Sequence, residues 1–263
     1  MKIDGSTIIV TGASSGIGAA LARAMVKRGA TVGIVGRRKD KLDAVLEQCR
    51  QRNPACRSWV ADLGDLDAAE AIARDAWDGF DGLDIIVNNA AMPKRRPAAR
   101  LAMSEVEETM RVNFLSPARM TLALLPGMLA RGSGVIVNVS SMGGRIGIAH
   151  EAAYCASKFA LCGWSEGLAI DLDGSGVVVR LIEPGPIDTD IWDRPGEDTA
   201  VFVPDLVAPE IVADGIIAAV EGEGFEHYLP DLKSVVTWKE SDIDAYIRSG
   251  ADLRRRAEAG PQP

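Results

Sequence analysis

A tyrosine and a lysine lie four residues apart in the stretch Tyr154-Cys155-Ala156-Ser157-Lys158, thirteen residues after Ser141. On a helix, positions i and i+4 share one face, so the ammonium can lie beneath the phenol. A nearby cation favours the ionised phenol, although lowering its pKa from about 10 to about 7 takes roughly 4 kcal/mol. The pair is suited to passing a proton to or from a substrate oxygen. On a solvated helix face the same spacing would have no chemical role.

A glycine-rich stretch, Thr11-Gly12-Ala13-Ser14-Ser15-Gly16-Ile17-Gly18, follows the β-branched run at 7–10 and precedes a helical pattern over 19–28. A strand, a glycine turn and a helix in this order direct backbone N–H groups and a helix N-terminus towards a phosphate. We expect Gly12 to allow the tight turn, Gly16 to let a pyrophosphate approach, and Gly18 to allow close helix–strand packing. Taken alone, the loop could also be a purely structural turn.

Short apolar runs alternate with helical patterns along the chain, which is typical of parallel α/β folds. The expected strands lie at 7–10, 31–35, 58–61, 83–87, 135–139 and 177–182. This layout predicts a single-domain, doubly wound parallel β-sheet flanked by helices, Rossmann-like, over 1–250. We expect the aperiodic stretch at about 190–209 to form a substrate lid, and 251–263 to be a flexible tail.

Composition excludes several classes of protein. With 263 residues, of which 47% are hydrophobic, the chain can bury one large core. The sequence has no run of about eighteen apolar residues and no apolar leader at its start, so we expect no membrane span and a cytoplasmic location. A net charge of -8 argues against a nucleic-acid partner. The four cysteines have no metal-like or redox-like spacing, so no metal site is expected.

Six features occur in an order and at spacings that resemble the short-chain dehydrogenase/reductases. They are TGASSGIG at 11–18, NNAA at 88–91, Asn113, Ser141, Tyr154 with Lys158, and Pro184-Gly185. The resemblance runs from about Lys2 to about Val220. It implies an NAD(P)-binding oxidoreductase that interconverts a carbonyl and a secondary alcohol by hydride transfer, with a small-molecule substrate and a homodimeric or homotetrameric state.

The resemblance also implies a role for each catalytic residue. Tyr154 exchanges a proton with the substrate oxygen, and Ser141 donates a hydrogen bond to the same oxygen. Lys158 lowers the pKa of the phenol and holds the nicotinamide ribose. Asn113 kinks its helix and holds a water that relays protons to Lys158. Read from the sequence alone, Asn113 would be a local hydrogen-bonding residue.

Most of the implied cofactor contacts follow the ends of the expected strands. Asp62 matches a carboxylate that accepts a hydrogen bond from the adenine amine, although it also suits a helix N-cap or a loop. The family commonly has glycine where Ala91 stands. The full set of implied cofactor contacts is Gly12, Ser14, Ser15, Gly16, Ile17, Gly18, Arg37, Arg38, Asp62, Leu63, Asn89, Ala90, Ala91, Tyr154, Lys158, Pro184, Gly185, Ile187 and Thr189.

The end of the second expected strand indicates which dinucleotide is bound. Gly36 is followed by Arg37, Arg38 and Lys39, with no carboxylate to bind the adenosine ribose hydroxyls. A guanidinium can hold a 2′-phosphate through paired hydrogen bonds, so NADP(H) is favoured. NAD(H) remains possible, because Ser15 stands where NADP enzymes of this family often carry a basic residue.

Two other function classes remain as alternatives. A non-catalytic nucleotide-sensing or scaffold protein would share the fold but usually lacks catalytic residues. A sugar-nucleotide epimerase or dehydratase also uses a Tyr-x-x-x-Lys pair, but the short chain and the TGASSGIG loop argue against it.

Several residues near the expected crevice are open to two interpretations. The basic run at 94–96 is either a solvated loop or an attractor for an anionic substrate. Trp192 either packs on an apolar substrate or anchors the lid. His150 either lies on the surface or contacts substrate.

Overall fold

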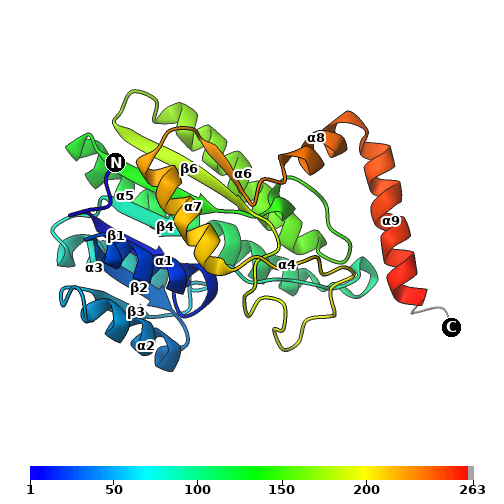
Figure 1. The fold of residues 1–263 in the computed structure, drawn as a ribbon, viewed down its shortest axis with the longest axis horizontal. Coiled ribbons are helices and arrows are strands. Elements are labelled where there is room, and N and C mark those ends of the chain that lie inside the picture. Colours follow the sequence, from blue (N-terminus) through cyan, green and yellow to red (C-terminus); the bar gives the residue numbers. More distant parts are fainter. Residues whose placement is uncertain (260–263) are drawn as a thin grey trace.

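A seven-stranded sheet forms the centre of the computed structural model, which describes residues 1–259 (Figure 1). Its strands are β1 (Thr7–Thr11), β2 (Thr31–Gly36), β3 (Arg57–Val60), β4 (Ile85–Asn88), β5 (Gly134–Val139), β6 (Val177–Pro184) and β7 (Glu226–Leu229). Their order is β3-β2-β1-β4-β5-β6-β7, and neighbouring strands pair in parallel. The chain therefore changes direction across the sheet between β1 and β4, where α/β folds open a crevice at the carboxyl edge.

Helices cover both faces of the sheet. They are α1 (Gly16–Lys27), α2 (Lys39–Arg50), α3 (Leu66–Gly79), α4 (Met103–Met110), α5 (Ser116–Arg131), α6 (Ala152–Asp171), α7 (Pro209–Glu221), α8 (Lys233–Ser241) and α9 (Ile243–Ala259), with short turns η1 (Ala98–Arg100), η2 (Arg111–Leu115) and η3 (Met142–Gly144). Helices α1, α2 and α7 pack on one face, and α3, α5 and α6 on the other. The predicted doubly wound α/β fold is confirmed.

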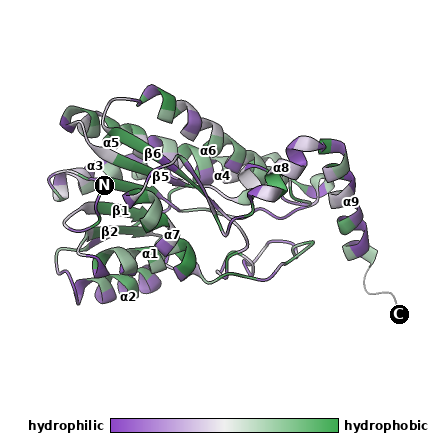
Figure 2. Cartoon of the chain, turned by 45° about the horizontal axis from the view of Figure 1, so that its top comes forward, coloured by the Kyte–Doolittle hydropathy of each residue, from purple (hydrophilic) through white to green (hydrophobic). Residues whose placement is uncertain are grey.

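Alternation along each strand supplies both hydrophobic cores. Ile8 and Val10 of β1 pack into the core beneath α1 and α7, whereas Ile9, between them, packs beneath α3 and α5. Because both faces are covered, the central strands β4 and β5 are buried at every position. Figure 2 shows the result, with hydrophobic colour concentrated in the sheet and hydrophilic colour on the outer helix faces.

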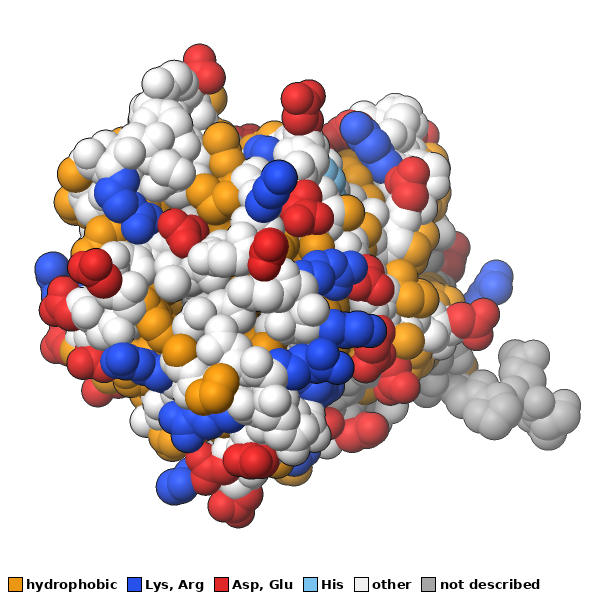
Figure 3. Space-filling model, turned by 60° about the vertical axis from the view of Figure 1, so that its left-hand side comes forward, with side chains coloured by type: hydrophobic (Ala, Val, Ile, Leu, Met, Phe, Trp, Pro, Cys, Tyr) orange, Lys and Arg blue, Asp and Glu red, His pale blue; other side chains and the backbone are white. Residues whose placement is uncertain are grey.

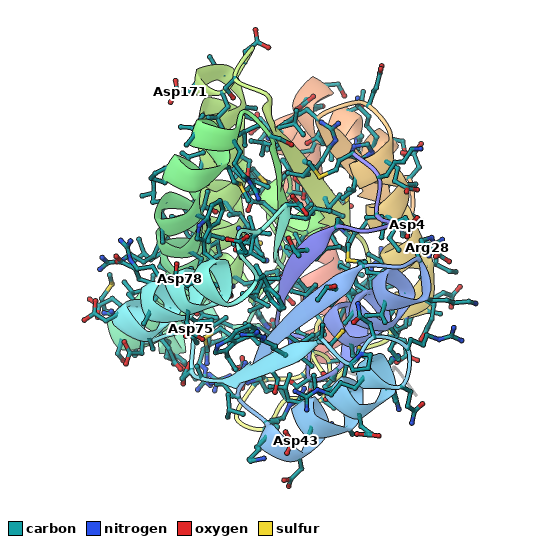
Figure 4. All side chains as sticks on the ribbon, turned by 90° about the vertical axis from the view of Figure 1, so that its left-hand side faces the viewer. Asp4, Arg28, Asp43, Asp75, Asp78 and Asp171 are labelled. Atoms are coloured by element: carbon teal, nitrogen blue, oxygen red, sulfur yellow. The ribbon has the colours of Figure 1, made fainter. Side chains whose placement is uncertain are left out.

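Charged side chains lie on the outside of these layers. Figure 4 labels Asp43, Asp78 and Asp171 on the outer helices, whereas Asp75 of α3 accepts a hydrogen bond from Trp59 Nε1 of β3 at 2.6 Å. On the face drawn in Figure 3, positive and negative side chains are interspersed. Within residues 1–259, no helix has the length and apolar character that a membrane crossing needs. The same residues contain no cluster of three or more His, Cys, Asp or Glu side chains arranged to hold a metal ion.

A buried polar network joins the two central strands to the helices behind them. Asn88 Nδ2 donates to Asn138 Oδ1 at 2.8 Å and to Thr121 Oγ1 at 3.1 Å, and Asn138 Nδ2 donates to Ser165 Oγ at 2.8 Å. The network connects β4 and β5 to α5 and α6. It therefore fixes the ends of the strands from which the site residues Asn89 and Ser141 emerge.

The structure differs from the sequence predictions beyond α7. The seventh strand, β7, was not predicted, because it is only four residues long, half-buried, and begins with a glutamate. The expected flexible tail over 251–263 is helical as far as Ala259, the end of α9, and 260–263 lie outside the described residues. Figure 1 shows α8 and α9 at one end of the molecule, outside the two helix layers.

Gly18 provides a test of the predicted close packing between the glycine loop and α1. In a helix, replacing glycine by alanine normally stabilises by about 0.5–1 kcal/mol. At Gly18, however, a Cβ atom would lie 2.6 Å from Asn89 Nδ2 and 2.7 Å from Gly12 O. We expect Gly18→Ala to lower the free energy of unfolding by about 1–3 kcal/mol in urea denaturation.

The matched control is Gly167→Ala in α6, where a Cβ atom would meet nothing within 4 Å. This variant should raise the free energy of unfolding by about 0.5–1 kcal/mol. A stabilising effect of Gly18→Ala would show that the helix is not held against the strand as described.

Candidate active site

One continuous pocket of about 920 Å³ lies at the carboxyl edge of the sheet. Its walls come from the glycine loop, from the segments that follow β2 to β6, from the irregular segment at about 190–209 that was expected to form a lid, and from α8 and α9. All but two of the site residues predicted from the sequence line it. The two exceptions are Gly18, which lies beneath the loop, and Asn113, which is fully buried behind the pocket.

The glycine loop packs so closely against neighbouring segments that two of its positions have no room for a Cβ atom. Gly12 has φ +69°, and a Cβ there would lie 2.7 Å from Ala90 Cα. Gly16 has φ +54°, and a Cβ there would lie 2.8 Å from Thr189 Cγ2. The N-cap of α1, Ser15, makes no side-chain capping hydrogen bond. The first N–H groups of α1 therefore face the pocket without a side-chain cap, which suits a phosphate of a dinucleotide.

Two arginines at the end of β2 add positive charge beside this loop. Arg38 donates to Ser14 Oγ at 3.1 Å, to the Ser15 hydroxyl, and to Asp190 Oδ2 at 2.5 Å. Hydrogen bonds from Arg38 and Lys41 lower the pKa of Asp190 to about 2. Arg37 is exposed and lies 3.4 Å from Asp62 Oδ2. Both guanidinium groups line the pocket where the adenosine end of a dinucleotide would lie.

Asp62 makes a local contact as well. Its Oδ1 accepts a hydrogen bond from Gly64 N at 2.9 Å, so it also has the loop role that the sequence left open. Its other oxygen, Oδ2, faces Arg37. Both roles are compatible with its place in the pocket lining beside Leu63.

Ser141 and Tyr154 meet at the centre of the pocket. Ser141 caps η3 directly after β5, and its Oγ accepts a hydrogen bond from Gly143 N at 3.0 Å. Tyr154 lies in the first turn of α6, is 8% exposed, and has Ser141 beside its phenol. Burial raises the pKa of the Tyr154 phenol above its ordinary value, and the neighbouring Ser141 opposes this only in part.

Lys158 lies one turn further along α6 and is 1% exposed. Its Nζ donates to Val139 O at 2.9 Å and lies 5.9 Å from the centroid of the Tyr154 ring. Burial lowers the pKa of Lys158 to about 8, while neighbouring Cys162 and Glu183 favour its charged form. At neutral pH the group carries its proton. We expected Lys158 to lower the pKa of the phenol, but in this structure burial is the larger influence on Tyr154.

Asn113 lies in a π-helical turn, η2, between α4 and α5. Its Oδ1 accepts from Met92 N at 2.8 Å, and its Nδ2 donates to Met92 O and to Ser157 Oγ, both at 3.0 Å. An extra residue in a helical turn redirects the chain, which matches the kink expected at this position. Asn113 therefore ties the segment after β4 to the helix that carries Tyr154 and Lys158.

Glu183 is a buried carboxyl group that the sequence analysis did not assign to the site. It is fully buried at the end of β6, and accepts hydrogen bonds from Ser141 N and from Cys162 Sγ, each at 3.1 Å. Arg145 Nε lies 3.4 Å from its Oε1. Burial raises the pKa of Glu183 to about 7. A signal was present, because Glu183 is the one acid in the otherwise apolar end of the sixth strand, directly before Pro184-Gly185.

The basic run at 94–96 is not a solvated loop, because Lys94 and Arg95 are 7% and 2% exposed. Lys94 pairs with Glu197 at 2.9 Å. The Arg95 guanidinium donates to Ile191 O and Trp192 O, both at 2.8 Å, and to Asp198 O at 3.2 Å. The run therefore holds the lid segment against the body of the protein.

The two remaining uncertain residues also have structural partners. Trp192 donates from Nε1 to Ile187 O at 2.7 Å, so it anchors the lid while its ring lines the pocket. His150 has φ +64° and places Nε2 3.3 Å from Glu258 in α9.

Comparisons with known proteins find relatives that match most of the chain. A family model described as short chain dehydrogenase matches residues 6–200. A D-threitol dehydrogenase of Mycolicibacterium smegmatis is 34% identical over 256 residues, covering 96% of this chain and 92% of that protein. A fatty acyl-CoA reductase of Mycobacterium tuberculosis is 38% identical over 238 residues, covering 86% of this chain and 73% of that protein. The structure of a short-chain dehydrogenase from Sphingobium yanoikuyae in complex with NADPH has a TM-score of 0.79 at 27% identity, covering 98% of this chain and 96% of that one.

The buried Glu183 generates a prediction for the pH dependence of stability. Because its folded pKa of about 7 exceeds its ordinary value of 4.5, the folded state binds more protons than the unfolded state between these pH values. This carboxyl group therefore makes stability fall as the pH rises from 4.5 to 7. We expect Glu183→Gln to show a smaller fall in unfolding free energy over this range, measured by chemical denaturation at several pH values.

Glu166→Gln is the control, because Glu166 also pairs with Arg145, at 2.6 Å, but is 48% exposed. Its pH profile should follow that of the unmodified protein. An unchanged profile for Glu183→Gln would mean that this carboxyl group does not titrate in that range.

Proposed function

Because the chain belongs to the short chain dehydrogenase family, we propose that it is an NADP(H)-dependent oxidoreductase that interconverts a carbonyl and a secondary alcohol. The observation that carries this proposal is the convergence of Ser141, Tyr154 and Lys158 in the pocket that also contains the glycine loop. When bound, the nicotinamide supplies the hydride. The residues of the chain supply orientation, hydrogen bonds and the proton.

Ser141 and Tyr154 act on the substrate oxygen in this proposal. Both residues line the pocket and lie beside each other, so an oxygen atom can be bound by both hydroxyl groups. In the direction of reduction, Tyr154 gives its proton to the oxygen as negative charge develops there. A phenol with a raised pKa is fully protonated at neutral pH, which suits it to act as the acid. In the reverse direction, the Lys158 ammonium beneath the ring favours the phenolate.

Lys158 and Asn113 support this pair from behind. An ammonium has three N–H donors, and Lys158 gives one of them to Val139 O. We assign the others to the hydroxyl groups of the nicotinamide ribose. Asn113 positions Ser157, the neighbour of Lys158, and we retain the expectation that a water near it relays protons to Lys158.

The preference for NADP(H) is supported by Arg37 and Arg38 at the end of β2 and by the related structure in complex with NADPH. NAD(H) is the second candidate. It stays a candidate because Ser15 stands where a basic residue would further favour the 2′-phosphate of NADP(H). Asn89, Ala90, Pro184, Gly185, Ile187 and Thr189 are assigned to the ribose and nicotinamide end of the cofactor, as the pocket lining permits.

The quaternary structure we propose is a homodimer formed by α5 and α6. Several large apolar side chains on these two helices and at the start of α5 are exposed, namely Leu115, Leu122, Leu129, Phe159 and Ile170. Exposed apolar surface of this kind commonly marks an interface between subunits. A tetramer remains the second candidate.

Tyr154→Phe tests the proposed chemistry. This change removes only the phenolic hydroxyl, so we expect kcat to fall by about 10²–10⁴-fold while the Kd for NADPH changes little. The assay follows NADPH absorbance at 340 nm with a panel of ketones, aldehydes, 3-oxoacyl thioesters and polyols, and NADPH binding is measured by fluorescence. Tyr228→Phe in β7 serves as the control and should keep its activity. If kcat of Tyr154→Phe equals that of the unmodified protein, Tyr154 does not transfer the proton.

Arg37→Ala and Arg38→Ala test the preference for NADP(H). Each lost hydrogen bond to a charged group costs about 1.5–3 kcal/mol, so the Kd for NADPH should rise by roughly 10–100-fold. The Kd for NADH should change much less. Lys39→Ala, which removes a partner of Asp43 on the outer face of α2, is the matched control and should leave both dissociation constants unchanged. Equal weakening of NADPH and NADH by both arginine variants would refute the assignment.

A further inference from the structure

Helix α9 is attached to the loop that follows the catalytic serine. The hydroxyl of Tyr246 in α9 donates to Gly147 O at 2.7 Å, and Glu258 lies 3.3 Å from His150 Nε2. Trp238 of α8 packs edge-on against Tyr246, with ring centroids 5.3 Å apart. None of the described residues of α9 is buried. The helix is therefore held by contacts beside the pocket, and contributes little to the core beneath the sheet.

Three residues of α9 line the same pocket as Tyr154, namely Tyr246, Gly250 and Leu253. The pocket of about 920 Å³ has two parts, and one of them follows the glycine loop and the strand ends that suit a dinucleotide. Much of the other part is lined by 146–149, by the lid, and by α8 and α9. These segments surround the space that is left for the substrate.

The side chains of this second part are mostly apolar. They include Ile146, Ile148, Trp192, Val201, Phe202 and Leu253. The hydrogen-bond donors of two aromatic residues in this part are already used, since Trp192 Nε1 donates to Ile187 O and the Tyr246 hydroxyl donates to Gly147 O. Their rings therefore present apolar surface to the pocket.

The charged residues of the pocket are also largely occupied. The Arg95 guanidinium donates to three carbonyl groups of the lid. Asp190 pairs with Arg38. Burial lowers the pKa of Arg194, and the charges of Arg37 and Arg38 lower it further, so Arg194 lies towards the adenosine end. Glu151 is a half-buried carboxyl group near Tyr154, and desolvation raises its pKa to about 7, which favours its neutral form.

We propose that α9 forms the distal wall of the substrate site, and that the substrate is an apolar ketone or secondary alcohol whose hydrocarbon part extends from Tyr154 to Leu253. The proposal rests on the function proposed above. A buried methylene gains about 0.8 kcal/mol, whereas a buried hydroxyl without a partner costs about 1–3 kcal/mol. This wall therefore favours hydrocarbon and disfavours a polyol, whose hydroxyl groups would lack partners.

The experiment measures kcat/KM with NADPH for straight-chain 2-ketones of increasing length, from four to twelve carbons, and kcat/KM with NADP for a four-carbon polyol. Each added methylene that reaches the wall should raise kcat/KM by up to about fourfold, which is 0.8 kcal/mol converted at 25 °C. The polyol should be a poor substrate. No dependence on chain length, or a preference for the polyol, would overturn the proposal.

Leu253→Ser tests the wall directly, and Ile247→Ser is its matched control. Both leucine and isoleucine are exposed residues of α9, at 41% and 59%, so neither change should unfold the protein. Only Leu253 lines the pocket. Leu253→Ser should lower the ratio of kcat/KM for the longest to the shortest ketone by about fivefold, the loss expected for one to two buried methylene groups. Ile247→Ser should leave the ratio unchanged, and equal ratios for the two variants would overturn the proposal.

Binding separates failure of this inference from failure of the proposed function. Calorimetric titration of the NADPH-loaded protein with the twelve-carbon ketone should show weaker binding in Leu253→Ser than in Ile247→Ser. If no ketone is turned over but this binding difference is found, the apolar site stands and the proposed reaction fails. If short ketones are turned over but the two variants bind the long ketone equally, the reaction stands and the proposed wall fails.

Discussion

A fully buried ammonium group is the constraint on which the active site depends. Removing such a charge from water costs several kcal/mol, and the cost is recovered only when hydrogen bonds and an opposite charge lie close by. Val139 O at the end of β5 accepts from Lys158, and Glu183 at the end of β6 favours its charged form. The same two strand ends hold Ser141, through its backbone N–H and the carboxylate of Glu183. Satisfying one cation therefore also fixes the serine beside the phenol.

Local patterns in the sequence were sufficient for strands β1 to β6 and for the glycine loop, because strand alternation and glycine sterics act over a few residues. The i, i+4 spacing placed Tyr154 and Lys158 on one helix face, whereas Asn113 and Ser141 were assigned through the family resemblance. Contacts between distant segments could not be predicted. Lys94 and Arg95 look the same in sequence whether they are solvated or paired with Glu197 and the lid. Glu183 was not assigned to the site, since nothing near it in sequence indicates Arg145 as a partner. Helix α9 has many charged residues in its sequence, and only its contacts in the folded structure, with Gly147 and His150, show that it adjoins the site.

The pocket changes in character along its length. At the end beside β2, arginine side chains, serine hydroxyl groups and uncapped N–H groups of α1 present donors to an anionic ligand. At the end beside α9, the donors of Trp192 and Tyr246 already form hydrogen bonds with backbone carbonyl groups. Ser141 and Tyr154 lie between the two. This polarity allows two chemically different molecules to meet in one orientation, with their reacting atoms at the boundary between a polar and an apolar region.

Arg95 holds the lid in a way that does not depend on the side chains of the lid. All three acceptors of the guanidinium, in Ile191, Trp192 and Asp198, are main-chain oxygens. Every amino acid offers such an oxygen, so these attachments do not depend on which side chains the lid carries. The lid can therefore acquire new side chains facing the substrate while its backbone stays in place. A clamp that binds only main-chain oxygens thus leaves the neighbouring side chains free to change.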